Sequence, residues 1–309
     1  MKITKLNPKL KKLFGNLGIY RFICLPAGKA GILIFGFWIF FSNSSFADLK
    51  VIAHAESFPG RTFVAFLPSS ETYKSAKLEF AQREYNFFQY EKGLRAIVGV
   101  PLDQKLGDYI LTVKAINKEG REEIISAPII ISKKYYPKVS FWLKPAKHKL
   151  LKQTDVIVDE WAEIEKQLLI ETPAKKWNGF LLKPVNGETS MVFGTRELVN
   201  NKPRSQHKGW DLAVNQGSPV KAADNGKVVV AKFYKAYGGT VAIDHGQGIF
   251  SIYFHLSKIY AKVGDEVTKG QVFGLSGNTG ISSGPHLHFA LSVHNLRVDP
   301  MQWVQTVIP

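Results

Sequence analysis

Short runs of alternating apolar and polar residues, separated by turn residues, fill the chain from residue 48 to residue 134. Thr62–Leu67 ends at a Pro-Ser-Ser turn, Tyr109–Ala115 alternates, and Ala127–Ser132 follows an Asn-Lys-Glu-Gly turn. Successive side chains of a strand point to opposite faces, so each run predicts a β-strand. Several short strands over residues 48–134 predict an immunoglobulin-like β-sandwich, here without a core disulfide.

The pattern changes over residues 135–178, which we expect to be a linker with one helix. Apolar residues recur there at mostly helical spacing and predict a helix from about Thr154 to Glu171, before Pro173. The preceding stretch is rich in lysine and by default is a solvated surface. We expect the helix to pack between two domains.

Strand-like runs return over residues 179–309, now interrupted by closely spaced glycines. These glycines are Gly264, Gly270, Gly274, Gly277, Gly280 and Gly284. Because no long helical pattern interrupts the strands, this part predicts an antiparallel β domain whose turns place loops around a groove. The fold class expected for the whole chain is therefore mainly β.

Residues 1–47 have the composition of an export segment. Seven basic residues and no acidic ones occur there, and an apolar run of 12 residues spans positions 30–41. Ser45 and Ala47 supply the small residues of a cleavage site. The run is shorter than the roughly 20 residues of a membrane span. We expect a signal peptide cleaved after Ala47, or an uncleaved membrane anchor through residues 30–41.

Charge and cysteine content narrow the possible chemistry. The net charge is +16, and beyond residue 47 there remain 34 basic and 25 acidic residues, which leaves +9. A positive chain suits an anionic polymer partner, although charge speaks to association and not to fold. The single cysteine, Cys24, lies in the export segment, so the mature chain would have no disulfide, thiolate ligand or cysteine nucleophile.

Histidines concentrate in the last domain, which holds six of the eight: His207, His245, His255, His286, His288 and His294. His207 and Asp211 are four residues apart, and His286 and His288 are two apart, so on strands each pair would share one face. Three imidazoles or carboxylates that converge hold a catalytic zinc ion and leave a fourth position open. A further histidine, such as His255, could then serve as a base.

Eight motifs accompany these residues in order. They are Phe193–Arg196, Arg204–Ala213, Gly217–Ala222, Ile243–Gly246, Tyr253–Ser257, Val263–Gln271, Ser276–Gly280 and Ser283–Phe289. Over about 130 residues this order resembles the lysostaphin/LytM-type zinc endopeptidases, a family with an antiparallel β peptidase domain. The preceding sandwich is similar to the N-terminal domain of some bacterial members.

The resemblance implies a role for each matching position. His207, Asp211 and His288 match the ligands of one zinc ion. His255 and His286 match two catalytic histidines that do not bind the metal, and which of them is the base stays open. The Asp-His-Gly turn indicates a structural role for His245, and we expect none at the site for His294.

Other classes fit less well. A cupin places a glutamate soon after a His-x-His pair, but Phe289–Val293 holds no carboxylate. A lipoyl or biotinyl carrier needs a lysine commonly beside methionine, and neither Met191 nor Met301 adjoins one. The serines lie in no nucleophile elbow. The serious alternative is a non-enzymatic cell-wall regulator that activates another hydrolase, because some family members have lost zinc ligands.

The resemblance implies a zinc metalloendopeptidase that cuts peptidoglycan cross-links or stem peptides during cell-wall remodelling. We expect a monomer in the periplasm, at the cell envelope or outside the cell, and no nucleic-acid partner. A D-alanyl–diaminopimelate cross-link or another stem bond is favoured over a glycine bridge. The sandwich would position the enzyme on the wall or cover its groove.

Overall fold

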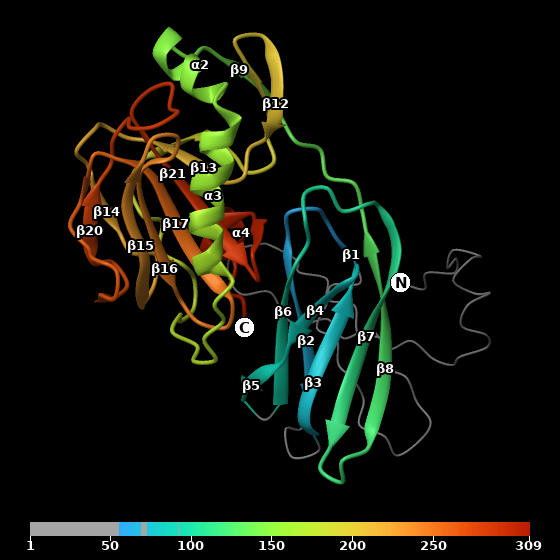
Figure 1. The fold of residues 1–309 in the computed structure, drawn as a ribbon. Coiled ribbons are helices and arrows are strands. Elements are labelled where there is room, and N and C mark those ends of the chain that lie inside the picture. The colour runs from blue at the N-terminus through green and yellow to red at the C-terminus, as the bar shows by residue number, and fades with distance from the viewer. Residues whose placement is uncertain (1–55, 69–72, 92) are drawn as a thin grey trace, which may run out of the picture.

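The computed structural model describes residues 56–68, 73–91 and 93–309 (Figure 1). The expected export segment, with its apolar run and Cys24, lies outside these residues. Across the described part, none of the helices combines the length and apolar character needed to cross a membrane.

Residues 56–131 form two sheets. The strands are β1 (Glu56–Ser57), β2 (Thr62–Pro68), β3 (Tyr73–Phe80), β4 (Arg83–Asn86), β5 (Phe88–Tyr90), β6 (Gly93–Gly99), β7 (Gly107–Asn117) and β8 (Glu122–Ile131). One sheet has the order β1-β8-β7-β3-β4 and the other β2-β6-β5. Inward side chains of both sheets, such as Leu67, Leu78 and Leu111, share one buried core. With β2 and β6 in one sheet and β3, β7 and β8 in the other, the strands divide as in an immunoglobulin-type sandwich.

The expected linker contributes one strand and two helices to the C-terminal domain. These are β9 (Lys138–Phe141), α2 (Pro145–Leu151) and α3 (Thr154–Leu168). Ile164 and Leu168 of α3 are buried against Val230, Ala242 and other residues on one face of the large C-terminal sheet. Figure 1 shows α3 lying across these strands. The helix therefore packs on the C-terminal domain and not between the domains, because the sheet offers its apolar face a matching apolar surface.

The C-terminal domain is built from antiparallel strands. They are β10 (Glu188–Met191), β11 (Arg196–Val199), β12 (Lys202–Gln206), β13 (Trp210–Ala213), β14 (Pro219–Lys221), β15 (Gly226–Tyr234), β16 (Gly238–Asp244), β17 (Ile249–Leu256), β18 (Lys258–Ile259), β19 (Glu266–Val267), β20 (Val272–Leu275), β21 (His286–Val293) and β22 (Leu296–Val298). Helix α4 (Pro300–Gln305) follows. The expected mainly β class is confirmed.

Three sheets make up this domain. The large sheet has the order β10-β13-β21-β17-β16-β15-β19, with β22 on β21. One face meets α3, and the other shares a buried core with Val220 of β14 and Phe273 of β20, which belong to the small β14-β20-β18 sheet. The third sheet, β12-β11-β9, includes the linker strand β9, which runs parallel to β11.

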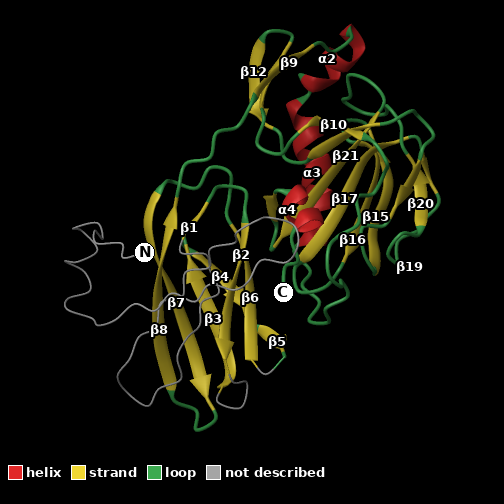
Figure 2. Ribbon diagram, turned by 180° about the vertical axis from the view of Figure 1, so that it is seen from behind, coloured by secondary structure: helices red, strands yellow, loops and turns green. Residues whose placement is uncertain are grey.

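The sandwich docks against α4 and the end of β21. Gln302 binds the backbone of Thr62 twice, accepting from its N–H at 2.8 Å and donating to its carbonyl at 2.7 Å. Trp303 Nε1 donates to Thr62 Oγ1 at 3.0 Å, and Gly99 lies against Val293 and Val298. These contacts lie at the Val293 end of β21, about 23 Å along the strand from His286. These contacts of the sandwich are therefore far from His286; Figure 2 shows the sandwich beside α4.

We predict that Gln302→Ala weakens this interface. It would leave the buried N–H and C=O of Thr62 without partners, at about 1–3 kcal/mol each. Denaturant unfolding should show a loss of about 2–6 kcal/mol in the free energy of unfolding. Gln305→Ala, on the exposed side of the same helix, is the matched control. Equal stability of the two variants would contradict the interface described here.

Candidate metal centre and catalytic histidines

The register between β13 and β21 places Asp211 directly opposite His288. Residues opposite each other in an antiparallel pair share a face, and Asp211 Oδ1 lies 2.8 Å from His288 Nδ1. His286 is two residues earlier on the same face, and its Nε2 lies 3.7 Å from Asp211 Oδ2. The same-face geometry expected for His286 and His288 is present.

His207 reaches the same point by another route. It lies after β12 in the turn before β13, so the expectation that His207 and Asp211 share one strand is wrong. The turn passes close to His288, because a Cβ on Gly209 would come within 2.3 Å of His288 Nε2. His207 Nε2 then lies 3.1 Å from Asp211 Oδ1. Glycine thus permits the close approach that strand alternation does not supply.

Three side-chain atoms converge as a possible metal site. His207, Asp211 and His288 each offer one ligand atom, and these atoms lie within 4.8 Å of one another. His207 Nε2 and Asp211 Oδ1 are buried, and neither has a partner aligned for a hydrogen bond. Two imidazole nitrogens and one carboxylate oxygen are a donor set for zinc, whose tetrahedral ligands lie about 3.3 Å apart. The residues present therefore fit a metal ion of this kind.

The electrostatics of this group favour a cation. Burial alone would lower the pKa of His207, but the carboxylates of Asp211 and Glu197 outweigh it and raise that pKa to about 9. Burial would raise the pKa of Asp211, but His288 and His207 hold it well below its usual value. Burial lowers the pKa of His288 to about 4 against the pull of Asp211. A bound metal would replace the proton on His207.

Glu197 on β11 is a site residue that the sequence did not reveal. Its side chain is buried, and Oε1 accepts from His207 Nδ1–H at 2.8 Å. Such a contact fixes the tautomer that turns Nε2 toward Asp211. The sequence signal that could have indicated Glu197 is the Asn200-Asn201 pair, which forms a turn with φ of 50° and 63°. A two-residue turn of this kind folds β12 back on β11 and brings Glu197 beside His207.

A β-bulge directs His255 toward the site. The pairing of β16 with β17 shifts register between Gly239 and Val241, and His255 has a left-handed φ of 64°. A bulge of this kind can re-aim a side chain. The His255 and His286 ring centroids then lie 4.9 Å apart. The bulge therefore joins a histidine of β17 to the histidines of β21.

The two rings are held in the same way. His255 Nδ1–H donates to the carbonyl of Thr279 at 2.8 Å, and His286 Nδ1–H donates to the carbonyl of Gly284 at 2.8 Å. Each ring therefore keeps Nε2 as an acceptor. Burial, followed by the neighbouring His286 and His288, holds the pKa of His255 well below its usual value, so its ring is neutral near pH 7.

The other two histidines of the domain lie elsewhere. Both ring nitrogens of His245 are engaged, with the carbonyl of Asn225 at 2.7 Å and Ser251 Oγ at 2.7 Å. His294 Nδ1 lies 3.2 Å from Glu171 Oε1, near the docked sandwich. The structure thus brings together His207, Asp211, His255, His286 and His288, and leaves His245 and His294 apart.

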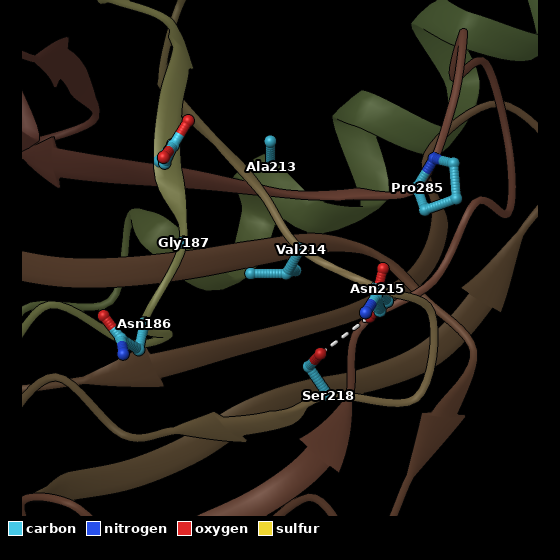
Figure 3. A pocket seen from close by; sticks show the side chains of 8 residues that line it. Asn186, Gly187, Ala213, Val214, Asn215, Ser218 and Pro285 are labelled. Atoms are coloured by element: carbon cyan, nitrogen blue, oxygen red, sulfur yellow. Dashed lines mark hydrogen bonds between the residues drawn. The ribbon is translucent and has the colours of Figure 1, made fainter.

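An open hollow lies beside the strand position of His286, and Figure 3 shows residues that line it. Ala213, which pairs with His286, lies in its wall together with Val214, Asn215 and Pro285. Gly187 and Glu188 form another part of the lining. Through Ala213 the hollow adjoins His286 on the neighbouring strand.

We predict that Glu197→Ala weakens metal binding, because His207 would lose the partner that orients its ring. Loss of such a partner typically lowers metal affinity about 10–100-fold. Titration of the purified protein with zinc against a competing chelator measures the change. Glu188→Ala, an exposed glutamate on β10, should leave the affinity unaltered. Unchanged affinity in Glu197→Ala would rule out this role.

Comparison with known proteins agrees with this geometry. Residues 205–300 match the sequence model of peptidase family M23. Peptidoglycan DD-endopeptidase ShyA of Vibrio cholerae is 44% identical over 96 residues, which are 31% of this chain and 22% of ShyA. Lysostaphin of Staphylococcus simulans is 41% identical over 106 residues, 32% of this chain and 22% of lysostaphin. The matched stretch thus spans about a fifth of these curated relatives.

One solved structure is similar over both domains. It is described as that of an M23 peptidase from Pseudomonas aeruginosa and has a TM-score of 0.60 and 29% identity. The similarity covers 81% of this chain and 95% of that chain. All five converging residues lie within the stretch that matches the family. The C-terminal part of this chain is a peptidase domain of family M23, of the LytM type.

Proposed function

We propose that this chain is a zinc-dependent endopeptidase that hydrolyses peptide bonds in peptidoglycan, in cross-links or stem peptides. The observation that carries the proposal is the complete donor set of His207, Asp211 and His288 with two oriented imidazoles beside it. The substrate class is supported by relatives such as ShyA, which is named a peptidoglycan DD-endopeptidase.

In this proposal His207, Asp211 and His288 hold one zinc ion through Nε2, Oδ1 and Nδ1. When bound, zinc supplies a Lewis acid that polarises a carbonyl and acidifies water. Glu197 orients His207 for this purpose, and Gly209 leaves the space in which the ring of His288 lies.

His255 and His286 move the protons of the reaction. Each ring has its Nδ1–H bound to a backbone carbonyl, which leaves Nε2 free to accept a proton from water. The same nitrogen can later return the proton to the leaving amine. The second ring can then hydrogen-bond the oxyanion that develops on the scissile carbonyl.

The proposal extends to location. Peptidoglycan lies outside the cytoplasmic membrane, so the chain must be exported, and the basic and apolar composition of residues 1–47 supports this. We propose that it acts as a monomer in the periplasm or cell envelope, and that residues 30–41 anchor it where the segment is not cleaved.

Digestion of purified peptidoglycan tests the function. The mature protein should release peptide fragments with new amino termini, which mass analysis of the products identifies. A zinc chelator should abolish the release, and added zinc should restore it. Activity that survives both chelation and His288→Ala would refute the zinc mechanism. A protein that holds zinc but releases nothing, while stimulating another hydrolase, would favour the regulator.

Two variants separate the roles of the histidines. His288→Ala should lose both bound zinc and activity. His255→Ala should retain zinc while kcat falls about 10²–10⁴-fold, the range for loss of a general acid or base. His148→Gln on α2 is the histidine control and should match the unaltered protein. Loss of zinc from His255→Ala would contradict its placement outside the metal site.

A further inference from the structure

His255 depends on two loops for its position. Its left-handed backbone conformation costs about 1–3 kcal/mol and persists only when its surroundings hold it. Its backbone N–H donates to the carbonyl of Tyr237 at 3.2 Å, in the turn between β15 and β16. Its ring donates to the carbonyl of Thr279, in the loop between β20 and β21. Both main chain and side chain are therefore held from outside β17.

The two loops also bind each other. Thr279 Oγ1 accepts from the N–H of Gly239 at 3.0 Å, and Ala236 accepts from the N–H of Ile281 at 2.7 Å. A Cβ on Gly280 would lie 2.4 Å from the backbone nitrogen of Gly238. The loops therefore form one unit around His255, and a shift of either loop would displace the other.

The first helix of the linker anchors the Thr279 loop. Lys147 on α2 donates from Nζ to the carbonyl of Asn278 at 3.0 Å and to the carbonyl of Gly280. These two carbonyls flank Thr279 on either side. The Lys147 side chain is partly buried, and burial lowers its pKa. Hydrogen bonds from a charged donor are roughly twice as strong as neutral ones, so Lys147 is a firm anchor.

The second helix anchors the other loop. The carboxylate of Glu160 on α3 accepts from the N–H of Lys235 at 2.6 Å and from the N–H of Ala236 at 2.8 Å. These residues immediately precede Tyr237, whose carbonyl binds the backbone of His255. Each loop of the unit is thus tied to the linker by one charged side chain.

We infer that Lys147 and Glu160 are positioning residues for His255, through which the helices of the linker form part of the active site. The inference rests on the proposed function for the reaction that His255 serves. It also assigns a task to residues 135–178 that lies beyond joining two domains. A displacement of about 1 Å in a catalytic group can lower a rate up to 10²-fold. Residues that hold the loops around His255 can therefore affect the rate without contacting the substrate.

Nuclear magnetic resonance of the imidazole groups tests the inference without substrate. The Nδ1–H of His255, bound to Thr279, should give a slowly exchanging signal that His255→Gln lacks. Lys147→Met, which keeps the length of the side chain but removes its donors, should lose or broaden that signal. Lys147→Arg, which keeps charge and donors, and Lys149→Met, an exposed neighbour on α2, should retain it.

Kinetics supply the second readout. Lys147→Met should lower kcat roughly tenfold with unchanged KM and zinc content, since it displaces His255 and not the substrate or the metal. In a His255→Ala background the same substitution should have no further effect, because its influence acts through that ring. Glu160→Gln should act in the same direction, whereas Asp159→Asn, an exposed neighbour, should have no effect.

Two results would overturn the inference. One is that Lys147→Met leaves both the His255 signal and kcat unchanged. The other is that Lys147→Met lowers kcat by the same factor in the His255→Ala background as in the unaltered protein. If Lys147→Met does not fold, Glu160→Gln tests the inference through the same two measurements, the His255 signal and kcat. A protein whose His255 signal depends on Lys147 but which cleaves nothing would contradict the proposed function and leave the positioning role intact.

Discussion

The antiparallel register between β13 and β21 is the constraint on which the site depends. It sets Asp211 opposite His288 on the face of the sheet against which α3 packs, while the pair between the site residues, Leu212 and Leu287, is fully buried in the core on the other face. A slip of one residue would exchange the two faces, so that the carboxylate and the imidazole would point into the apolar core and the leucines would take their place in the site. Burial of the two leucines on one face therefore fixes the register that places Asp211 opposite His288 on the other.

Part of the site could be predicted from residue patterns alone. Two-residue spacing on a strand correctly placed His286 beside His288 on one face. The pairing of His207 with Asp211 was expected on one strand, but it arises in a turn where Gly209 allows close approach. Glu197 could not be predicted as a site residue, because its place beside His207 depends on how β12 folds back on β11. The bulge at His255 lies in an apolar run that gives no local sign of it.

For the fold, too, local patterns predicted some features and distant contacts determined the others. Alternation and turn residues predicted the strands of both domains, because burial of one face imposes a local period. Where the α3 helix packs could not be predicted, because that depends on the apolar surface that the distant strands β15, β16 and β17 build together. The docking of the sandwich likewise depends on single contacts between residues far apart in sequence, such as Thr62 with Gln302. The linker, in contrast, binds the loops around His255 through Lys147 and Glu160.

The central claim is that three side chains hold one zinc ion while two further histidines remain outside its coordination. Anomalous diffraction at the zinc edge, from crystals of the mature chain grown with zinc, tests it most directly. The account predicts one peak about 2.0–2.2 Å from His207 Nε2, Asp211 Oδ1 and His288 Nδ1, with His255 and His286 not bonded to it. A peak at another site, or one coordinated by His255 or His286, would contradict it.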